Sequence, residues 1–272
     1  MSQSKSKQAA YVQARESLLA EITESLRNDE RFVAAWLAGG YGRGEQIWTS
    51  DLDIHVVVTD AYSESLCAMP WPSGGRTTPE RLKLFQQFGT PAIIYDAHAN
   101  NQLGGSFTHI VYQESAQNVD WMLTPQQKAH VLHDTLLLFD KVGLPAAPAE
   151  EPETQEEQSE RASMHVSFFW MIASANVMNL LAGDLCEFHM LLIFLEEALR
   201  DVRAALRGEQ ARYVSHTHSR VYATCEEQAT ALRSLCDEME KLMPTVVELG
   251  GYLPPAPRAV VEMRLALLEE ER

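Results

Sequence analysis

The segment PAAPAEEPETQEEQSE, residues 145 to 160, separates two parts of the chain that have different residue patterns. It is rich in Pro, Ala and Glu and holds no large apolar residue, which is typical of a linker between domains. Short apolar runs broken by turns precede it, and stretches with helical periodicity follow it. For a chain of 272 residues this predicts two domains, residues 1–148 and residues 149–272. The Glu-rich half of the segment is compatible with the start of the next helix.

The first domain is predicted to have an α+β fold, in which helices flank a mixed β-sheet. Apolar residues at helical spacing predict a helix over about residues 8–28, and Thr78 with Pro79 marks the start of another. Apolar, β-branched runs bounded by Gly, Pro and polar turn residues predict strands. The predicted strands are RFVAAWLAGG, DLDIHVVV, TPAIIYDAH and the hairpin pair THIVYQE and VDWML. The stretch KAHVLHDTLLLFDKVG predicts a short helix followed by one more strand.

The second domain is predicted to be a helical bundle. Its apolar residues recur at helical spacing in several stretches, and the connections are short enough for antiparallel packing. We expect the first helix to end at Gly183, the second at Gly208 and the third at Pro244. Glycine favours helix ends, and proline lacks the N–H group that continues the hydrogen-bond pattern. A further helix is predicted within APRAVVEMRLALLEEE.

The acidic balance of the chain bears on its partners. A formal net charge of −16 repels a nucleic-acid backbone, so no nucleic-acid partner is expected. The four cysteines show neither a C-x-x-C pair nor zinc-ligand spacing, which favours reduced thiols. The residues MSQSKSKQAA have no apolar core typical of a secretory signal, and no apolar run approaches membrane-spanning length. We therefore expect a cytoplasmic monomer or homodimer without a membrane partner.

Two aspartates, Asp51 and Asp53, open the predicted strand that follows the glycine-rich stretch GGYGRGE. Side chains alternate along a strand, so both carboxylates project from one face, where they repel each other. A divalent cation between them removes this repulsion, and ligands that are all oxygen suit Mg²⁺. The competing interpretation is structural, with Asp51 capping a turn and Asp53 at a strand edge. The order of strand, glycine loop and second strand favours the metal site.

The stretch GGYGRGE also supplies groups that bind phosphate. Its glycines let the backbone approach a ligand closely and direct N–H groups at it. A helix that starts near Gly42 would add a field that favours an anion. Arg43 offers a forked contact to a phosphate oxygen. We predict that the nucleotide-binding residues are Gly39, Gly40, Gly42, Arg43 and Ser50.

The stretch GGYGRGEQIWTSDLD resembles the signature of the DNA polymerase β-like nucleotidyltransferase superfamily, in which G-[GS] is followed by D-x-D. The resemblance is strong over residues 33–60, weaker through residue 140 and only architectural beyond. The superfamily includes aminoglycoside and lincosamide nucleotidyltransferases and uridylyltransferases, and the latter share the form GGYGRGE. Many members have serine where this chain has Gly40, so backbone N–H groups would replace a hydroxyl contact to phosphate.

The resemblance implies a third acidic residue on a neighbouring strand. Asp120 is the best match because it lies between apolar residues, where a charged side chain is unfavourable unless it has a function. Glu114 is the alternative. Two Mg²⁺ ions are implied, one held by Asp51 and Asp53 and one shared with Asp120. The first would bind the triphosphate, and the second would lower the pKa of the acceptor hydroxyl. Asp120 and Glu114 are also the candidates for a general base.

The architecture of the superfamily implies that the helical domain helps to bind the acceptor. The predicted contacts are Trp170, Asn176, Asp184 and Glu187, together with Glu114 of the first domain. Structural roles compete with this prediction. Asn176 is also suited to a hydrogen bond between helices, and Asp184 with Glu187 is also the pattern of a helix N-cap.

The activity implied is transfer of a nucleoside monophosphate from a nucleoside triphosphate to a hydroxyl of a small-molecule acceptor, with release of pyrophosphate. ATP is the expected donor. An aminoglycoside-like antibiotic, and hence a role in antibiotic resistance, suits an acidic chain because such acceptors are polycations. Two alternatives stay open, a protein-modifying adenylyl- or uridylyltransferase and a nucleotide-binding pseudoenzyme or regulatory module.

Overall fold

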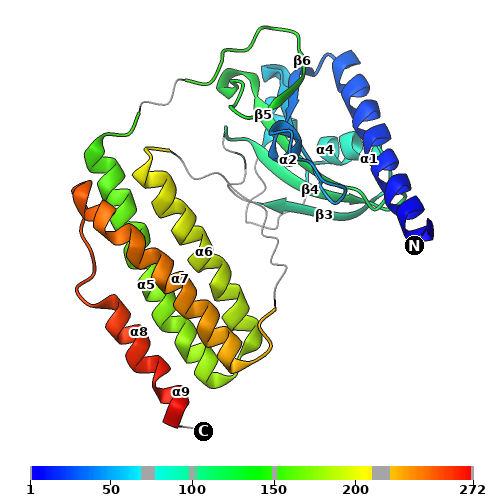
Figure 1. The fold of residues 1–272 in the computed structure, drawn as a ribbon. Coiled ribbons are helices and arrows are strands. Elements are labelled where there is room, and N and C mark those ends of the chain that lie inside the picture. Colours follow the sequence, from blue (N-terminus) through cyan, green and yellow to red (C-terminus); the bar gives the residue numbers. More distant parts are fainter. Residues whose placement is uncertain are drawn as a thin grey trace. The chain divides into compact units, whose positions relative to one another are not determined.

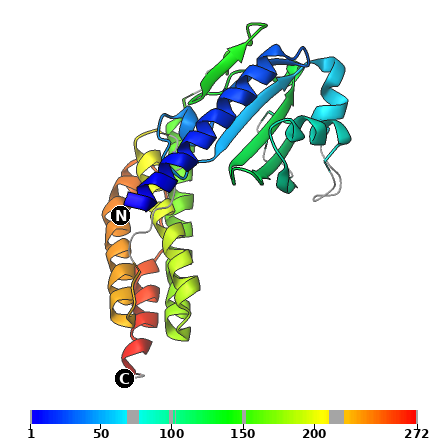
Figure 2. The same cartoon turned by 90° about the vertical axis from the view of Figure 1, so that its right-hand side faces the viewer.

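The computed structural model describes residues 2–68, 77–97, 101, 103–148, 152–209 and 221–270. The chain forms two compact units, Met1–Ala149 and Glu150–Arg272 (Figures 1 and 2). The predicted boundary after residue 148 adjoins residues 149–151, which lie outside the described residues. In the described parts of the chain all strands belong to the first unit and the second contains helices, so the fold is α+β with a C-terminal helical region.

The first unit is built on one mixed sheet of six strands. The strands are β1 (Phe32–Leu37), β2 (Leu52–Val58), β3 (Pro91–Ala97), β4 (Ser106–Tyr112), β5 (Asn118–Pro125) and β6 (Leu136–Asp140). Their order across the sheet is β3-β4-β5-β2-β1-β6. β2 pairs with β5 in parallel, whereas the other neighbouring strands are antiparallel. The strands and the hairpin predicted from the sequence are therefore present.

Helices cover one face of this sheet (Figure 2). They are α1 (Ser2–Asn28), which begins earlier than predicted, α3 (Ser63–Cys67), which follows a short 3₁₀ turn η1 (Asp60–Tyr62), and α4 (Pro79–Gln86). Thr78 caps α4 through a hydrogen bond from the Arg81 N–H group, as predicted. Alternate residues of β2 enter the core under these helices, so Asp53 and His55 lie on the opposite face.

The face of the sheet opposite the helices has a smaller core of its own. Trp36 of β1, Val57 of β2 and Ala129 are buried in it. Leu132 and Leu144, from the chain on either side of β6, pack against this core. The chain that follows β5 therefore covers part of the face that carries Asp53.

The structure describes all of residues 128–143, and the short helix predicted there is absent. The chain makes one 3₁₀ turn, η2 (Gln126–Lys128), and then runs without regular structure to β6. Asp134 has a φ of 54°, which is incompatible with a right-handed helix. The Asp134 carbonyl also packs so closely on Gly42 that a Cβ there would overlap it. Tertiary packing therefore overrides the helical pattern of this stretch.

The second unit consists of α5 (Gln155–Ala182), α6 (Leu185–Leu206), α7 (Cys225–Glu248), α8 (Pro257–Leu265) and α9 (Leu267–Glu270). α5, α6 and α7 pack side by side around one apolar core, and α8 lies against α5 (Figure 1). Thr154 and Thr224 begin α5 and α7 with capping boxes. α5 ends at Gly183, as predicted, and the positive φ of 68° there is the conformation that glycine adopts most readily.

The prediction that Pro244 ends the third helix is wrong, because α7 continues through it to Glu248. Proline removes one helical N–H group, which leaves a carbonyl one turn earlier without its partner. Glu240, which carries that carbonyl, and Pro244 are both exposed, so water can bind the carbonyl. Val246, beyond Pro244, is fully buried in the core. The burial of this last turn therefore outweighs the local cost of the proline.

The prediction that no segment suits a membrane needs a correction for α5. This helix passes a length and composition test for a membrane span, with a mean hydropathy of 1.3 in its most apolar window. A core helix of a bundle passes the same test, and Val166, Phe169, Ala173 and Val177 of α5 are buried in the second unit. The hydropathy is explained by these core positions.

Candidate functional site

Three carboxylates meet on the face of the sheet opposite the helices. Asp51 precedes β2, Asp53 lies within it, and Asp120 lies on β5, where it pairs with Asp53 in the parallel register. One oxygen from each of the three lies within 4.8 Å of the others, so we call these residues the acid triad. The structure thus brings together the three residues expected to be catalytic and to bind metal.

The surroundings of the acid triad raise the pKa of two of its three carboxylates. The pKa of Asp53 is raised to about 6, first by burial and then by the charges of Asp51 and Asp120, while Arg43 acts in the opposite direction. Burial also raises the pKa of Asp120, although a hydrogen bond from His109 opposes this shift. Repulsion between the carboxylates adds to the effect of burial on both pKa values, and a bound cation would relieve that repulsion.

The glycine stretch forms a short helix, α2 (Gly39–Gly42). It begins at Gly39, whereas from the sequence we considered a helix that starts near Gly42. It starts beside the acid triad, because the Ala38 N–H group donates to the Asp53 carbonyl over 2.9 Å. Gly39 has a φ of 58°, and a Cβ at this position would overlap the Asp53 carboxylate. The turn can therefore approach the acid triad only with glycine at residue 39.

The other predicted nucleotide-binding residues lie around α2. Arg43 follows it directly, and its guanidinium forms an ion pair with Glu45 at 2.8 Å. The Ser50 hydroxyl accepts a hydrogen bond from the Ile47 N–H group, and a Cβ on Gly40 would lie 3.4 Å from its oxygen. The side chains of Arg43 and Ser50 therefore lie between α2 and β2, where each contacts a residue of the same segment.

An arginine that we did not predict holds this turn in place. Arg15 of α1 is 2% exposed and donates to the backbone carbonyls of Trp48 and Ser50, at 3.1 and 2.5 Å. Its guanidinium also lies over the ring of Tyr41, whose hydroxyl donates to Glu16. These contacts fix the residues that lead into Asp51. In sequence, Arg15 is one polar residue of an amphipathic helix, and nothing marks it out.

A pocket of about 250 Å³ opens next to Asp53. Gly39 and Arg43 line one side, and Asp53, His55 and Met122 of the sheet also line it. The remaining wall comes from the stretch that we expected to be helical, residues 132–135. His55 is buried, stacks on Trp36 and has its pKa lowered to about 4 by burial, so its ring is neutral near pH 7. Polar side chains thus line much of this pocket beside the acid triad.

Glu114, the alternative third acid, is not part of the acid triad. It follows β4 and accepts hydrogen bonds from the Thr90 N–H group at 2.9 and 3.2 Å, which lowers its pKa. The register of the sheet explains the difference, since Asp120 stands opposite Asp53 whereas Glu114 lies in the turn between β4 and β5.

The predicted acceptor-binding residues of the second unit lie in structural positions. Trp170 is 4% exposed, and Asn176 is fully buried and donates to the Phe188 carbonyl over 3.2 Å. Asp184 caps α6 through a hydrogen bond from the Glu187 N–H group. These are the competing structural roles, and the acceptor contacts remain a prediction.

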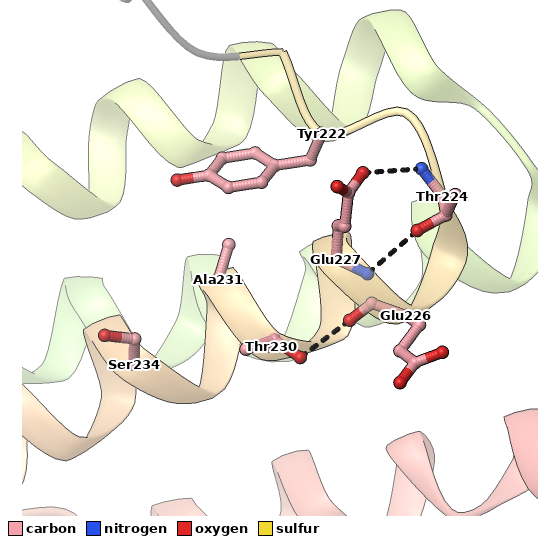
Figure 3. A pocket seen from close by; sticks show the side chains of 7 residues that line it. All are labelled: Tyr222, Thr224, Glu226, Glu227, Thr230, Ala231 and Ser234. Atoms are coloured by element: carbon pink, nitrogen blue, oxygen red, sulfur yellow. Dashed lines mark hydrogen bonds between the residues drawn. The ribbon is translucent and has the colours of Figure 1, made fainter.

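A second hollow, of about 400 Å³, lies at the start of α7. Figure 3 shows the Tyr222 ring beside Ala231, with Glu227 turned toward Thr224. Glu227 accepts from the Thr224 N–H group, and the Thr224 hydroxyl accepts from the Glu227 N–H group, so these groups form the capping box of α7. The polar groups of Thr224 and Glu227 in this hollow therefore stabilise the start of α7.

Comparisons with known proteins do not identify the function of the chain. No protein-family model matches the chain. No curated protein matches it. Among solved structures, the chain is similar to the STING-associated CdnE c-di-GMP synthase from Capnocytophaga granulosa, with 11% sequence identity and a TM-score of 0.31. The similarity covers 88% of this chain and 83% of that chain. Because so low a TM-score carries no functional inference, we base the function on the geometry of the site.

Proposed function

We propose that the chain is a nucleotidyltransferase that moves a nucleoside monophosphate, AMP from ATP, onto a hydroxyl of a small-molecule acceptor. The observation that carries the proposal is the convergence of Asp51, Asp53 and Asp120 within 4.8 Å beside a glycine turn. In the reaction, the acceptor oxygen bonds to the α-phosphorus as the bond to the bridging oxygen breaks, and pyrophosphate leaves. The acidic chain favours a cationic acceptor such as an aminoglycoside.

The residues present fit a divalent cation. All the donors of the acid triad are carboxylate oxygens, which Mg²⁺ prefers. The raised pKa of Asp53, about 6, leaves it mostly ionised near pH 7 and in need of a counter-charge. Asp51 and Asp53 would hold one ion, and Asp120 would help to hold a second. Bound Mg²⁺ would supply Lewis-acid stabilisation of charge on the phosphates and on the acceptor oxygen.

The chain's own groups bind and orient the donor. The N–H groups at the start of α2 belong to a first helical turn, where they have no acceptor within the helix and can bind phosphate oxygens. Arg43 lines the same pocket and would exchange Glu45 for a phosphate oxygen. The field of these donors favours the charge that develops on leaving pyrophosphate. Asp120 is the candidate to accept the acceptor's proton.

The experiment is a pyrophosphate-release screen with Mg²⁺, the four common ribonucleoside triphosphates and a panel of aminoglycosides, lincosamides and metabolites. Asp53→Asn is the control, because it keeps the size of the side chain and removes its charge. Removal of a metal ligand should slow release by about 100-fold or more, since loss of a mere supporting partner already costs 10- to 100-fold. Mass spectrometry of the product should show the acceptor carrying one nucleoside monophosphate.

Other results of the screen would contradict this function. Transfer of labelled nucleotide to proteins of a cell extract, and to none of the small molecules, would replace the small-molecule acceptor by a protein. Equal release by the wild-type chain and Asp53→Asn would exclude the acid triad from the chemistry.

A further inference from the structure

A histidine that the proposed reaction does not use lies next to the acid triad. His109 of β4 pairs with Asp120 of β5, and Asp120 pairs with Asp53 of β2. These residues form a row across three adjacent strands, and residues in such a row share one face of the sheet. The row therefore runs from a histidine at one end into the centre of the acid triad.

His109 and Asp120 are joined by a close contact. The Nδ1 atom of His109 lies 2.5 Å from Oδ1 of Asp120, which is a short hydrogen bond with the imidazole N–H group as donor and the carboxylate as acceptor. The side chains are 30% and 17% exposed, so the bond is partly shielded from water. The contact is thus more protected than a surface ion pair, whose geometry water and side-chain motion disturb.

The bond restricts the carboxylate of Asp120. The last torsion of an aspartate side chain has broad, shallow preferences, so an unsupported carboxylate samples many orientations. A hydrogen bond to Oδ1 fixes the plane of the carboxylate, and Oδ2 is then left for another partner. Among the residues that the structure describes, neither Asp51 nor Asp53 has a hydrogen bond to an imidazole, and Arg43 is the cation that acts on Asp53.

We infer that His109 is a positioning residue for a divalent cation, because its Nδ1–H group holds Asp120 in the orientation of a metal ligand. The inference rests on the proposed function, in which Asp120 is a metal ligand. Partners that orient metal ligands typically change metal affinity or activity by about 10- to 100-fold when they are removed.

The test is the affinity for Mn²⁺, titrated by calorimetry into the full chain and into three variants. His109→Leu removes the donor and keeps a side chain of moderate size. His109→Asn keeps an N–H donor on the atom that occupies the δ position, as Nδ1 does. Asp120→Asn removes the charge of the ligand itself and reports on the proposed metal site independently of His109.

We expect His109→Leu to bind Mn²⁺ about 10- to 100-fold more weakly than the wild type, and His109→Asn to stay within about threefold of it. Urea unfolding in a chelator should give similar unfolding free energies for the two His109 variants. This comparison separates positioning from a general structural role, which would affect Mn²⁺ binding only together with stability.

Each other outcome contradicts a distinct part of the account. Wild-type affinity in His109→Leu would overturn the role of His109, provided that Asp120→Asn weakens binding. Equal loss in both His109 variants would show that the ring itself is required, and not its Nδ1–H group. Unchanged affinity in Asp120→Asn, or no Mn²⁺ binding by the wild type, would overturn the proposed metal site and this inference with it.

Discussion

Gly39 lies so close to Asp53 that a Cβ at residue 39 would overlap Oδ2 of that carboxylate. The two residues belong to different elements, because Gly39 begins α2 and Asp53 lies in β2. The contact links the glycine turn to the acid triad, so a substitution at Gly39 should displace the Asp53 carboxylate.

A Gly39→Ala variant should therefore lose both stability and metal binding. Its positive φ alone costs an alanine about 1–2 kcal/mol, and displacement of Asp53 adds to this. Gly44→Ala is the matched control, because Gly44 also has a positive φ, of 69°, but nothing lies within 4 Å of an added Cβ. Urea unfolding and Mn²⁺ titration should show a stability loss in both variants and weakened metal binding only in Gly39→Ala. Similar metal binding by the two would refute the steric link.

The raised pKa of Asp53 predicts how the metal-free chain responds to pH. Its pKa is about 6 in the folded state and about 3.9 when unfolded, so ionisation favours the unfolded state. The stability that protonated Asp53 provides is complete below about pH 4 and is lost as pH rises through about 6. The full loss is about 3 kcal/mol. Asp53→Asn lacks this titration.

The measurement is the unfolding free energy of the wild type and Asp53→Asn in urea with a chelator, at about pH 4 and about pH 7. The difference between the two chains cancels most other titrating groups. Asp53→Asn should gain stability relative to the wild type as pH rises. If the difference in unfolding free energy between the two chains does not change with pH, the pKa of Asp53 is not raised in the folded state.

Replacement of Arg15 should loosen the turn that leads into Asp51. An Arg15→Met variant leaves the Trp48 and Ser50 carbonyls without their buried donor, which should lower the unfolding free energy by about 2–4 kcal/mol. Hydrogen exchange of residues 46–51 should become faster. Arg27→Met is the control, because Arg27 donates to a carbonyl in an exposed contact. Unchanged hydrogen exchange in Arg15→Met would show that the turn is ordered without the hydrogen bonds from Arg15.

Two substitutions of Asp184 distinguish a role in helix capping from a role in binding a cationic acceptor. Asp184→Ala should destabilise the chain by about 1 kcal/mol, because the Glu187 N–H group loses its acceptor. Asp184→Asn keeps an N-cap oxygen and should keep most of the stability, although it removes the charge. Once an acceptor is known, its KM in Asp184→Asn decides the role. A raised KM with normal stability would support acceptor binding, whereas an unchanged KM would leave capping alone.

Several features of both units follow from local rules of sequence. Alternation along β2 puts Asp53 on one face, and an apolar neighbourhood singles out Asp120 on β5. The helix starts at Thr78 and Asp184 also follow from the side chains that accept N–H groups. These features depend on residues near one another in sequence, or on a pattern with a single structural solution.

The features that sequence did not reveal depend on contacts between distant segments. Arg15 of α1 donates to carbonyls of the turn that leads into Asp51, and His109 of β4 contacts Asp120 of the neighbouring strand β5. The segment with Asp134 loses its helix to packing on Gly42, and Pro244 stays within α7 because the turn after it is buried. Each requires knowledge of which segments meet, and the periodicity of a single segment carries no such information.

The central claim is that the acid triad binds a nucleoside triphosphate through divalent cations. Calorimetric titration of a non-hydrolysable ATP analogue, with and without Mg²⁺, tests it without knowledge of the acceptor. We predict binding by the wild type that requires Mg²⁺, and a loss of about tenfold or more in Asp53→Asn. Failure of the wild type to bind the analogue with Mg²⁺, or equal binding by Asp53→Asn, would contradict the account.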